Sequence, residues 1–213
     1  MIEEIKHSVS TLPDTKTATA RALRKEYSQK IRDFTPEQVL DLAHELLDMQ
    51  GSWIYRFLAY ELIHFHKPTL RSLDESKLEK LGQGMSDWSH VDTFAPYLSG
   101  VAWRQGQIDD SVIHKWAHSE DRWWRRAALV STIALNTKAR GGKGDVSRTL
   151  AVCELLVDDK DDMVVKAMSW TLRELIPYDP DAVHNFLEKH DAVLSARIKR
   201  EVRNKLDTGL KNP

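Results

Sequence analysis

The sequence has 213 residues, 41% of them hydrophobic and 30% charged, with a formal net charge of −1 at pH 7. That composition is ordinary for a soluble globular protein, and the near-zero charge neither favours nor excludes nucleic acid as a partner. Cys153 is the only cysteine, which excludes an intrachain disulfide. Without an apolar run of roughly 20 residues or a signal-peptide start, we expect one cytoplasmic domain over residues 1–213 and no membrane partner.

Amphipathic helices are predicted along the whole chain. Thr35-Pro36-Glu37-Gln38 is a capping box with proline at the first helical position, and the apolar residues after it recur at helical spacing. Gly51 ends this helix, and Ser52 begins the next, which is expected to run to about residues 67–68. Further helix pairs are predicted at 72–83 with 86–104, 109–118 with 120–138, 145–158 with 161–176, and 180–190 with 195–206. No segment alternates like a strand, so the fold class is all-α.

The helix pairs repeat along the chain. Trp53, Trp88 and Trp123 lie 35 residues apart, each near the start of the second helix of its pair, and Arg56 and Arg126 occupy matching places. A period in the thirties built from helix pairs is typical of a HEAT-like solenoid, an α-α superhelix whose second helices line a concave side. Elongated ligands bind such a surface, and duplex DNA and protein segments are the usual candidates.

One repeat differs from the others at this position. Where the other repeats place arginine or lysine, the second pair has the segment Trp88-Ser89-His90-Val91-Asp92. Trp88 and Asp92 are four residues apart and therefore share one helix face. Pro96 follows four residues later and lacks the N–H that would bond the Asp92 carbonyl, so the helix should kink there.

Two interpretations of this pattern remain open. In the first, the tryptophans fill gaps between repeats and Asp92 pairs with Arg126. In the second, Asp92 supplies negative charge in a partly dry site, where it stabilises the cation that develops on a sugar during glycosidic cleavage. Indole faces would add to that stabilisation, and Arg126 would grip a neighbouring phosphate. An N3- or N7-alkylated purine suits this chemistry, because it is already cationic and leaves without protonation.

Clustered basic residues indicate a phosphate-binding track, although a solvated helix face is the alternative. The clusters lie at 16–32, 122–148 and 195–205, and the loop Arg140-Gly141-Gly142-Lys143-Gly144 could set backbone amides and a lysine against a phosphate. The expected DNA-binding side chains are Arg125, Arg140, Lys143, Lys166, Arg173, Arg197, Lys199 and Arg200. His114 and His118 lie one turn apart without an HExxH pattern, and we expect no metal site.

Several segments, taken in order, resemble the AlkD-like alkylpurine DNA glycosylases, the HEAT-repeat DNA alkylation repair family. The resemblance covers about residues 72–206 and is carried by Trp88-Ser89-His90-Val91-Asp92, Trp123-Trp124-Arg125-Arg126-Ala127-Ala128-Leu129, residues 166–174, Asp179-Pro180-Asp181-Ala182-Val183, and Leu194-Ser195-Ala196-Arg197. It implies a HEAT-like solenoid that excises 3-methyladenine and 7-methylguanine from duplex DNA without base flipping. The N-terminal third departs from the family pattern at Ser28–Phe34.

The resemblance also assigns roles to single residues. Asp92 matches the catalytic acid that positions water and stabilises the sugar cation. Trp88 and Trp170 match the aromatics that flank the lesion, and Arg126 matches the phosphate-binding arginine. Tyr27 matches an aromatic that faces the DNA.

The sequence therefore predicts a monomeric, monofunctional glycosylase that needs no cofactor and leaves an abasic site. A HEAT-repeat binder of damaged or branched DNA without catalysis is the first alternative. A protein-interaction scaffold with no nucleic-acid role is the second.

Overall fold

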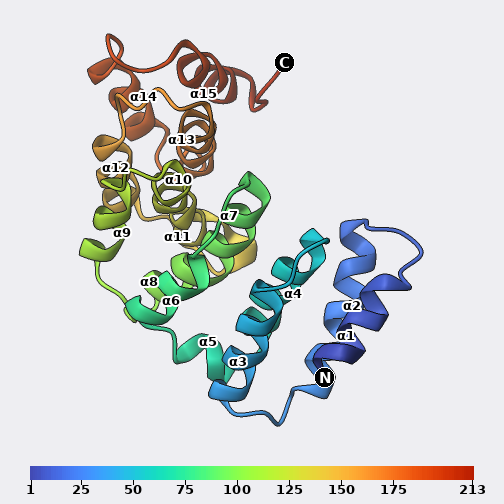
Figure 1. Ribbon diagram of the computed structural model, residues 1–213. Helices are drawn as coiled ribbons and strands as arrows, with labels where there is room; N and C mark the ends of the chain where they lie inside the picture. The colour runs from blue at the N-terminus through green and yellow to red at the C-terminus, as the bar shows by residue number, and fades with distance from the viewer. The chain divides into compact units, whose positions relative to one another are not determined.

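The computed structural model describes residues 1–213 and contains helices, turns and no β-strand (Figure 1). The all-α prediction is confirmed. The chain divides into two compact units, Met1–Gly84 and Met85–Pro213, and the division falls inside the helix pair expected at 72–104. None of the helices has the length and hydrophobicity that crossing a bilayer would require.

The first unit is built around α4 (Trp53–Phe65), against which α2 (Thr17–Lys30), α3 (Pro36–Leu47) and α5 (Lys67–Arg71) pack. The helices α1 (Ile2–Ser10) and α6 (Glu75–Gly82) complete it. The predicted capping box forms at α3, where the Thr35 hydroxyl accepts from Gln38 N and the Gln38 side chain accepts from Thr35 N. The helix expected to reach residue 67 ends at Phe65, and the buried His66 then caps the short α5 with its ring.

Tyr27 has a structural role, contrary to the expectation that it faces DNA. Its side chain is fully buried in the first unit, and its hydroxyl lies 3.0 Å from the Ser8 hydroxyl, which joins α2 to α1. A ring enclosed in this way cannot contact a bound duplex, so the match to a DNA-facing aromatic is wrong for this chain.

The second unit contains α7 (Trp88–Phe94), η1 (Ala95–Ser99), α8 (Gly100–Arg104), α9 (Asp110–Ala117), α10 (Arg122–Ser131), α11 (Ile133–Asn136), η2 (Lys138–Arg140), α12 (Val146–Leu155), α13 (Asp162–Leu175), α14 (Pro180–Lys189) and α15 (Ala196–Thr208). Its helices form two layers (Figure 1). In one layer α7, α10, α13 and α15 pack in succession, and in the other α9 packs against α12. The free Cys153 is buried in α12.

The helix that carries Trp88 and Asp92 is irregular at Pro96, as expected. It continues from α7 through a five-residue π-helical turn, Ala95–Ser99, into α8. Proline cannot complete the α-helical hydrogen-bond pattern, and a π turn is one way of absorbing the missing bond. Just beyond it, Gly100 lets α8 approach its neighbours closely, because a Cβ there would lie 2.3 Å from the Ser131 carbonyl oxygen.

Polar contacts between successive helix pairs preserve the period seen in the sequence. In the second unit, Ser99 bonds Ser131, Thr132 bonds Thr171, and Ser169 bonds Glu201, with separations of 32, 39 and 32 residues. Each of these bonds is buried and joins the second helix of one pair to the second helix of the next. The stacking of pairs that the tryptophan spacing predicted is therefore present within this unit.

Candidate functional site

The central feature of the site is an ion pair between α7 and α10. Asp92 and Arg126, 34 residues apart, meet because these two helices pack together. Arg126 Nε donates to Asp92 Oδ1 at 3.0 Å, and Nη2 lies 2.8 and 2.9 Å from Oδ1 and Oδ2. A guanidinium that engages both carboxylate oxygens fixes the orientation of the carboxylate as well as its charge. The ion pair that the sequence offered as a structural alternative is thus formed.

Arg126 is buried, and this placement disagrees with the expected phosphate contact. Its side chain is only 6% exposed, and its remaining nitrogen, Nη1, donates to the Met163 carbonyl oxygen on α13 at 2.6 Å. All three guanidinium nitrogens therefore already donate within the protein. The arrangement leaves Arg126 as a residue that holds Asp92, without the exposed surface that gripping a backbone phosphate requires.

Asp92 itself remains accessible, with 21% of its side chain exposed. Burial raises the pKa of the Asp92 carboxyl above its ordinary value of 3.8, while the adjacent Arg126 guanidinium opposes that rise. The side chain of Asp87 adds a smaller effect that raises the same pKa. The result is a carboxylate in a partly dry position, open on one side and held by a cation on the other.

Trp88 is the most exposed aromatic near this carboxylate. It is the first residue of α7, is 54% exposed, and precedes Asp92 by one helical turn. Asp87 caps the helix by accepting from Ser89 N at 2.8 Å, which sets the direction in which Trp88 leaves the backbone. A large aromatic surface left in water beside an open carboxylate is a feature that a ligand can cover.

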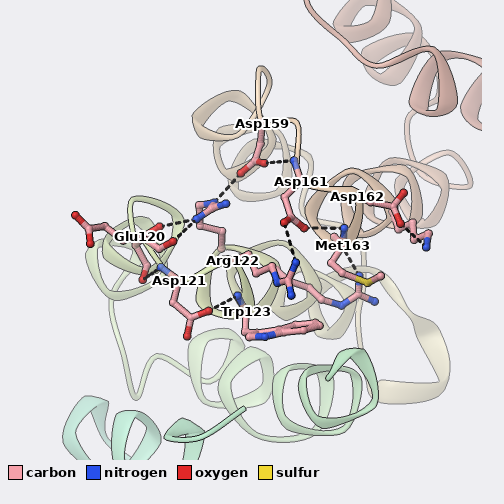
Figure 2. A network of polar contacts seen from close by, with 12 residues as sticks. Glu120, Asp121, Arg122, Trp123, Asp159, Asp161, Asp162 and Met163 are labelled. Atoms are coloured by element: carbon pink, nitrogen blue, oxygen red, sulfur yellow. Dashed lines mark hydrogen bonds and ion pairs between the residues drawn. The ribbon is translucent and has the colours of Figure 1, made fainter. Parts of the chain in front are cut away.

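The other tryptophans divide between core and surface. Trp124 packs against Phe94 at the end of α7 and against Trp116, with ring-centroid distances of 6.1 and 4.8 Å. Trp123 is partly exposed, with the Arg122 guanidinium 5.0 Å from its ring centroid (Figure 2). Trp170 lies on α13, partly exposed, and its indole N–H donates to Glu174 at 3.2 Å. Trp170 makes no hydrogen bond to Asp92 or Arg126.

An acidic loop between α12 and α13 neutralises part of the predicted DNA-binding track. Figure 2 shows Asp159 and Asp161 of this loop turned toward the basic face of α10. Arg125 Nε donates to Asp159 at 2.7 Å, and Arg122 Nη1 donates to Asp161 at 3.3 Å. Arg125 also donates to two backbone carbonyls, so it ties α10 to the next helix pair and has no free charge to offer DNA.

The remaining predicted DNA-binding cations fall into two groups. Lys166 and Arg197 both pair with Asp162, and Lys199 pairs with Asp191. In the second group no ion pair forms: Arg140 lies 4.1 Å from the Tyr97 ring centroid, Arg173 donates to the Ser169 hydroxyl, and Lys143 and Arg200 are exposed. Within this group Arg173 is half-buried and interacts with the carboxylates of Glu201 and Glu174, so the charges that stay available to a ligand are those of Arg140, Lys143 and Arg200.

The amides of the glycine-rich loop are not available for a phosphate. The N–H groups of Gly141, Gly142, Lys143 and Gly144 donate to the carbonyls of Lys138, Thr137, Leu135 and Leu135 respectively. The loop is thus closed on itself, and the expectation that its backbone could cradle a phosphate is wrong. In the His114 and His118 pair, Nδ1 of the His118 ring lies 2.8 Å from the His114 backbone carbonyl oxygen and is hydrogen-bonded to it.

Two elements of the site were missed from the sequence. One is the Met163 carbonyl that fixes Arg126, and the other is the acid-rich segment 158–162 that pairs with α10. A signal for the second was present, because Asp159 and Asp161 follow Arg125 and Arg122 by 34 and 39 residues, close to the repeat period.

Comparison with known proteins adds independent findings. The family model for the DNA alkylation repair enzyme matches residues 13–206. A solved structure, described as a predicted DNA alkylation repair enzyme from Enterococcus faecalis, superposes with a TM-score of 0.73 at 18% identity, covering 91% of this chain and 87% of that chain. At that identity the likeness shows a common helical-repeat fold. No curated protein sequence matches this chain.

Proposed function

The chain belongs to the DNA alkylation repair enzyme family, and on that premise we propose that it is a DNA glycosylase acting on cationic alkylated purines in duplex DNA. Its reaction would hydrolyse the N-glycosidic bond of 3-methyladenine or 7-methylguanine and leave an abasic site. Water is the second reactant, and the proposed reaction uses no cofactor. The observation that carries the proposal is the half-buried Asp92 carboxylate with the exposed Trp88 indole one turn away.

The charge on Asp92 would act on the sugar. As the glycosidic bond of an alkylated purine breaks, positive charge moves from the base onto the deoxyribose, and a nearby carboxylate stabilises it. Because the leaving base is already cationic, no general acid is needed. Partial burial strengthens the attraction, since less water screens it. The same carboxylate can orient a water molecule toward the sugar carbon.

Arg126 would serve this chemistry through Asp92. Its two-point contact holds the carboxylate in one orientation and favours its ionised form, against the effect of burial. This proposal replaces the phosphate contact expected from the sequence. Backbone phosphates would instead be met by exposed cations that form no ion pair within the protein, among them Arg200.

Trp88 would cover the nucleotide at the site, and we propose that Trp170 flanks the lesion from α13. An indole face lying on a sugar or cationic base stabilises positive charge by cation–π interaction, which is worth about 0.5–2 kcal/mol. Asp92 can be reached from the protein surface, so it can act on a nucleotide that lies against the protein while its base stays in the duplex. We therefore propose that the base is not flipped into a pocket.

A second candidate is a non-catalytic binder of damaged DNA. The ion pair favours it, because Asp92 and Arg126 satisfy each other without a ligand. The two functions differ in one measurable outcome, the release of free base from methylated duplex.

The test is Asp92→Asn, with Asp181→Asn on the exposed face of α14 as a matched control. We expect Asp92→Asn to lower the single-turnover rate of 7-methylguanine release by at least about 10²-fold, the usual effect of removing one electrostatic group of this kind. Duplex binding should remain, and Asp181→Asn should match the parent protein in both assays. Equal release by Asp92→Asn and the parent would refute the catalytic role. No release by any of the proteins, with binding intact, would favour the second candidate.

A further inference from the structure

A cavity of about 380 Å³ lies in the second unit beyond the ion-pair site. Its charged lining consists of Arg104, Lys143 and Arg148 with a single acid, Asp145. Arg104 follows Asp92 by 12 residues along the continuous run of α7, η1 and α8, which is about 18 Å at 1.5 Å per residue. The cavity is therefore separate from the carboxylate proposed to act on the sugar.

The one acid of the cavity is already committed to one of the three cations. Asp145 caps α12 by accepting from Arg148 N at 3.0 Å, and its other oxygen accepts from Arg148 Nε at 2.6 Å. Arg148 is held further by its position 5.0 Å from the Trp103 ring centroid. Once this pair is discounted, Arg104 and Lys143 leave the cavity with two positive charges that no carboxylate balances.

Arg104 is the less ordinary of these two cations. It is half-buried, and its Nη1 donates to the carbonyls of Ala134 and Arg140, but it forms no ion pair. Burial without a counter-ion lowers the pKa of the Arg104 guanidinium, because the charged form has lost hydration. An anion in the cavity would restore that lost interaction.

The wall of the cavity is preformed. Residues 140–145 use their backbone N–H groups within the protein, the last of them donating from Asp145 to the buried Asn136 side chain at 3.0 Å. Gly142 admits no side chain, since a Cβ would lie 2.6 Å from the Leu135 carbonyl oxygen. A ligand would therefore be recognised by cationic side chains, Lys143 from this loop and Arg104 from α8, at a wall that needs no ordering, which lowers the cost of binding.

We propose that this cavity binds a phosphate monoester or inorganic phosphate through Arg104 and Lys143, beside the Arg148–Asp145 pair. Such a group carries about −1.5 to −2 charge at pH 7, which matches the unbalanced charge of the cavity, whereas an internal phosphodiester or a carboxylate carries only about one. Guanidinium groups also suit the oxygens of a phosphate geometrically. The group can be free in solution or can stand at the end of a DNA strand. Both sources present the same chemistry.

The first measurement titrates inorganic phosphate into the full chain and follows the backbone amide resonances of Gly141, Gly142 and Gly144. We expect saturable shifts in the parent protein and in Asp92→Asn, so that the result does not depend on the proposed glycosylase activity. Lys143→Glu should weaken binding by about tenfold or more, because it removes one charge-assisted contact and places a negative charge in the cavity. Lys138→Glu is the control, because Lys138 is exposed on the same loop but does not line the cavity.

A second measurement separates the two sources. Nicked duplexes that carry a 5′-phosphate or a 5′-hydroxyl at the nick are added to the phosphate-bound protein. Displacement of inorganic phosphate from the cavity is followed by the amide resonances of the three glycines. Displacement by the phosphorylated nick alone assigns a strand terminus, and displacement by neither assigns free phosphate. The proposal is overturned if phosphate gives no saturable shift. It is equally overturned if Lys138→Glu weakens binding as much as Lys143→Glu, since the effect would then be general electrostatics.

Discussion

Replacing Arg126 by methionine tests whether the ion pair holds the site together. The substitution removes a guanidinium that is 6% exposed and leaves Asp92, 21% exposed, without its cation and Met163 without its donor. Breaking a buried pair from one side costs about 3–5 kcal/mol, and the partial exposure of Asp92 reduces this to about 2–4 kcal/mol. For a chain of this size a loss of about 3 kcal/mol lowers the melting temperature by about 6–12 °C.

The pH dependence of that loss identifies its cause. Burial raises the pKa of Asp92 in the folded state above its unfolded value of about 3.8, so ionising Asp92 lowers the free energy of unfolding. That loss develops as the pH rises from the unfolded-state pKa to the folded-state pKa. Without Arg126 the folded pKa rises further and the interval widens. The stability deficit of Arg126→Met relative to the parent should therefore be larger at neutral pH than near pH 4.

Urea unfolding at several pH values measures this deficit directly. Arg200→Met is the matched control, because Arg200 is exposed and unpaired, and its effect should stay within about 0.5 kcal/mol. Arg126→Lys, which keeps the charge but loses the two-point contact, should fall between the two. A deficit below about 0.5 kcal/mol for Arg126→Met, or one that does not change with pH, would refute the reasoning.

Three further predictions concern the same unit. Trp88→Ala should leave the melting temperature nearly unchanged, because the indole is 54% exposed, yet should slow release of 7-methylguanine; an unchanged rate would remove Trp88 from the site. Gly100→Ala should destabilise the fold by about 1–3 kcal/mol in urea, since its Cβ would meet the Ser131 carbonyl oxygen at 2.3 Å, and parent-like stability would show that α8 can shift. The Cys153 thiol is buried with its pKa raised, so a thiol reagent such as DTNB should react only as the protein unfolds; rapid labelling of the native state would contradict this.

Much of the local structure could be predicted from residues close together in the chain. The capping box at Thr35 and the irregularity at Pro96 depend on backbone hydrogen bonds between near neighbours, so a few adjacent residues specify them. The 35-residue spacing of Trp53, Trp88 and Trp123 likewise predicted stacked pairs, and contacts 32–39 residues apart cross between pairs in the second unit. The type of fold was therefore accessible without coordinates.

The roles of individual charges were decided only by tertiary structure. The basic segment 122–148 suggested a continuous DNA-binding track, but acids 34–39 residues away meet Arg122, Arg125 and Arg126 and neutralise them. The burial of Tyr27 and the internal hydrogen bonds of the loop amides could not be predicted from the sequence either. Whether a side chain is buried, paired or free depends on which distant residues packing brings opposite it, and local sequence does not encode that. The sequence alone predicted a repeated stack of helices with a single acid out of pattern, and it left open whether Arg126 pairs with that acid or binds a phosphate. The folded chain decided that Asp92 stays within reach of solvent and is held by Arg126.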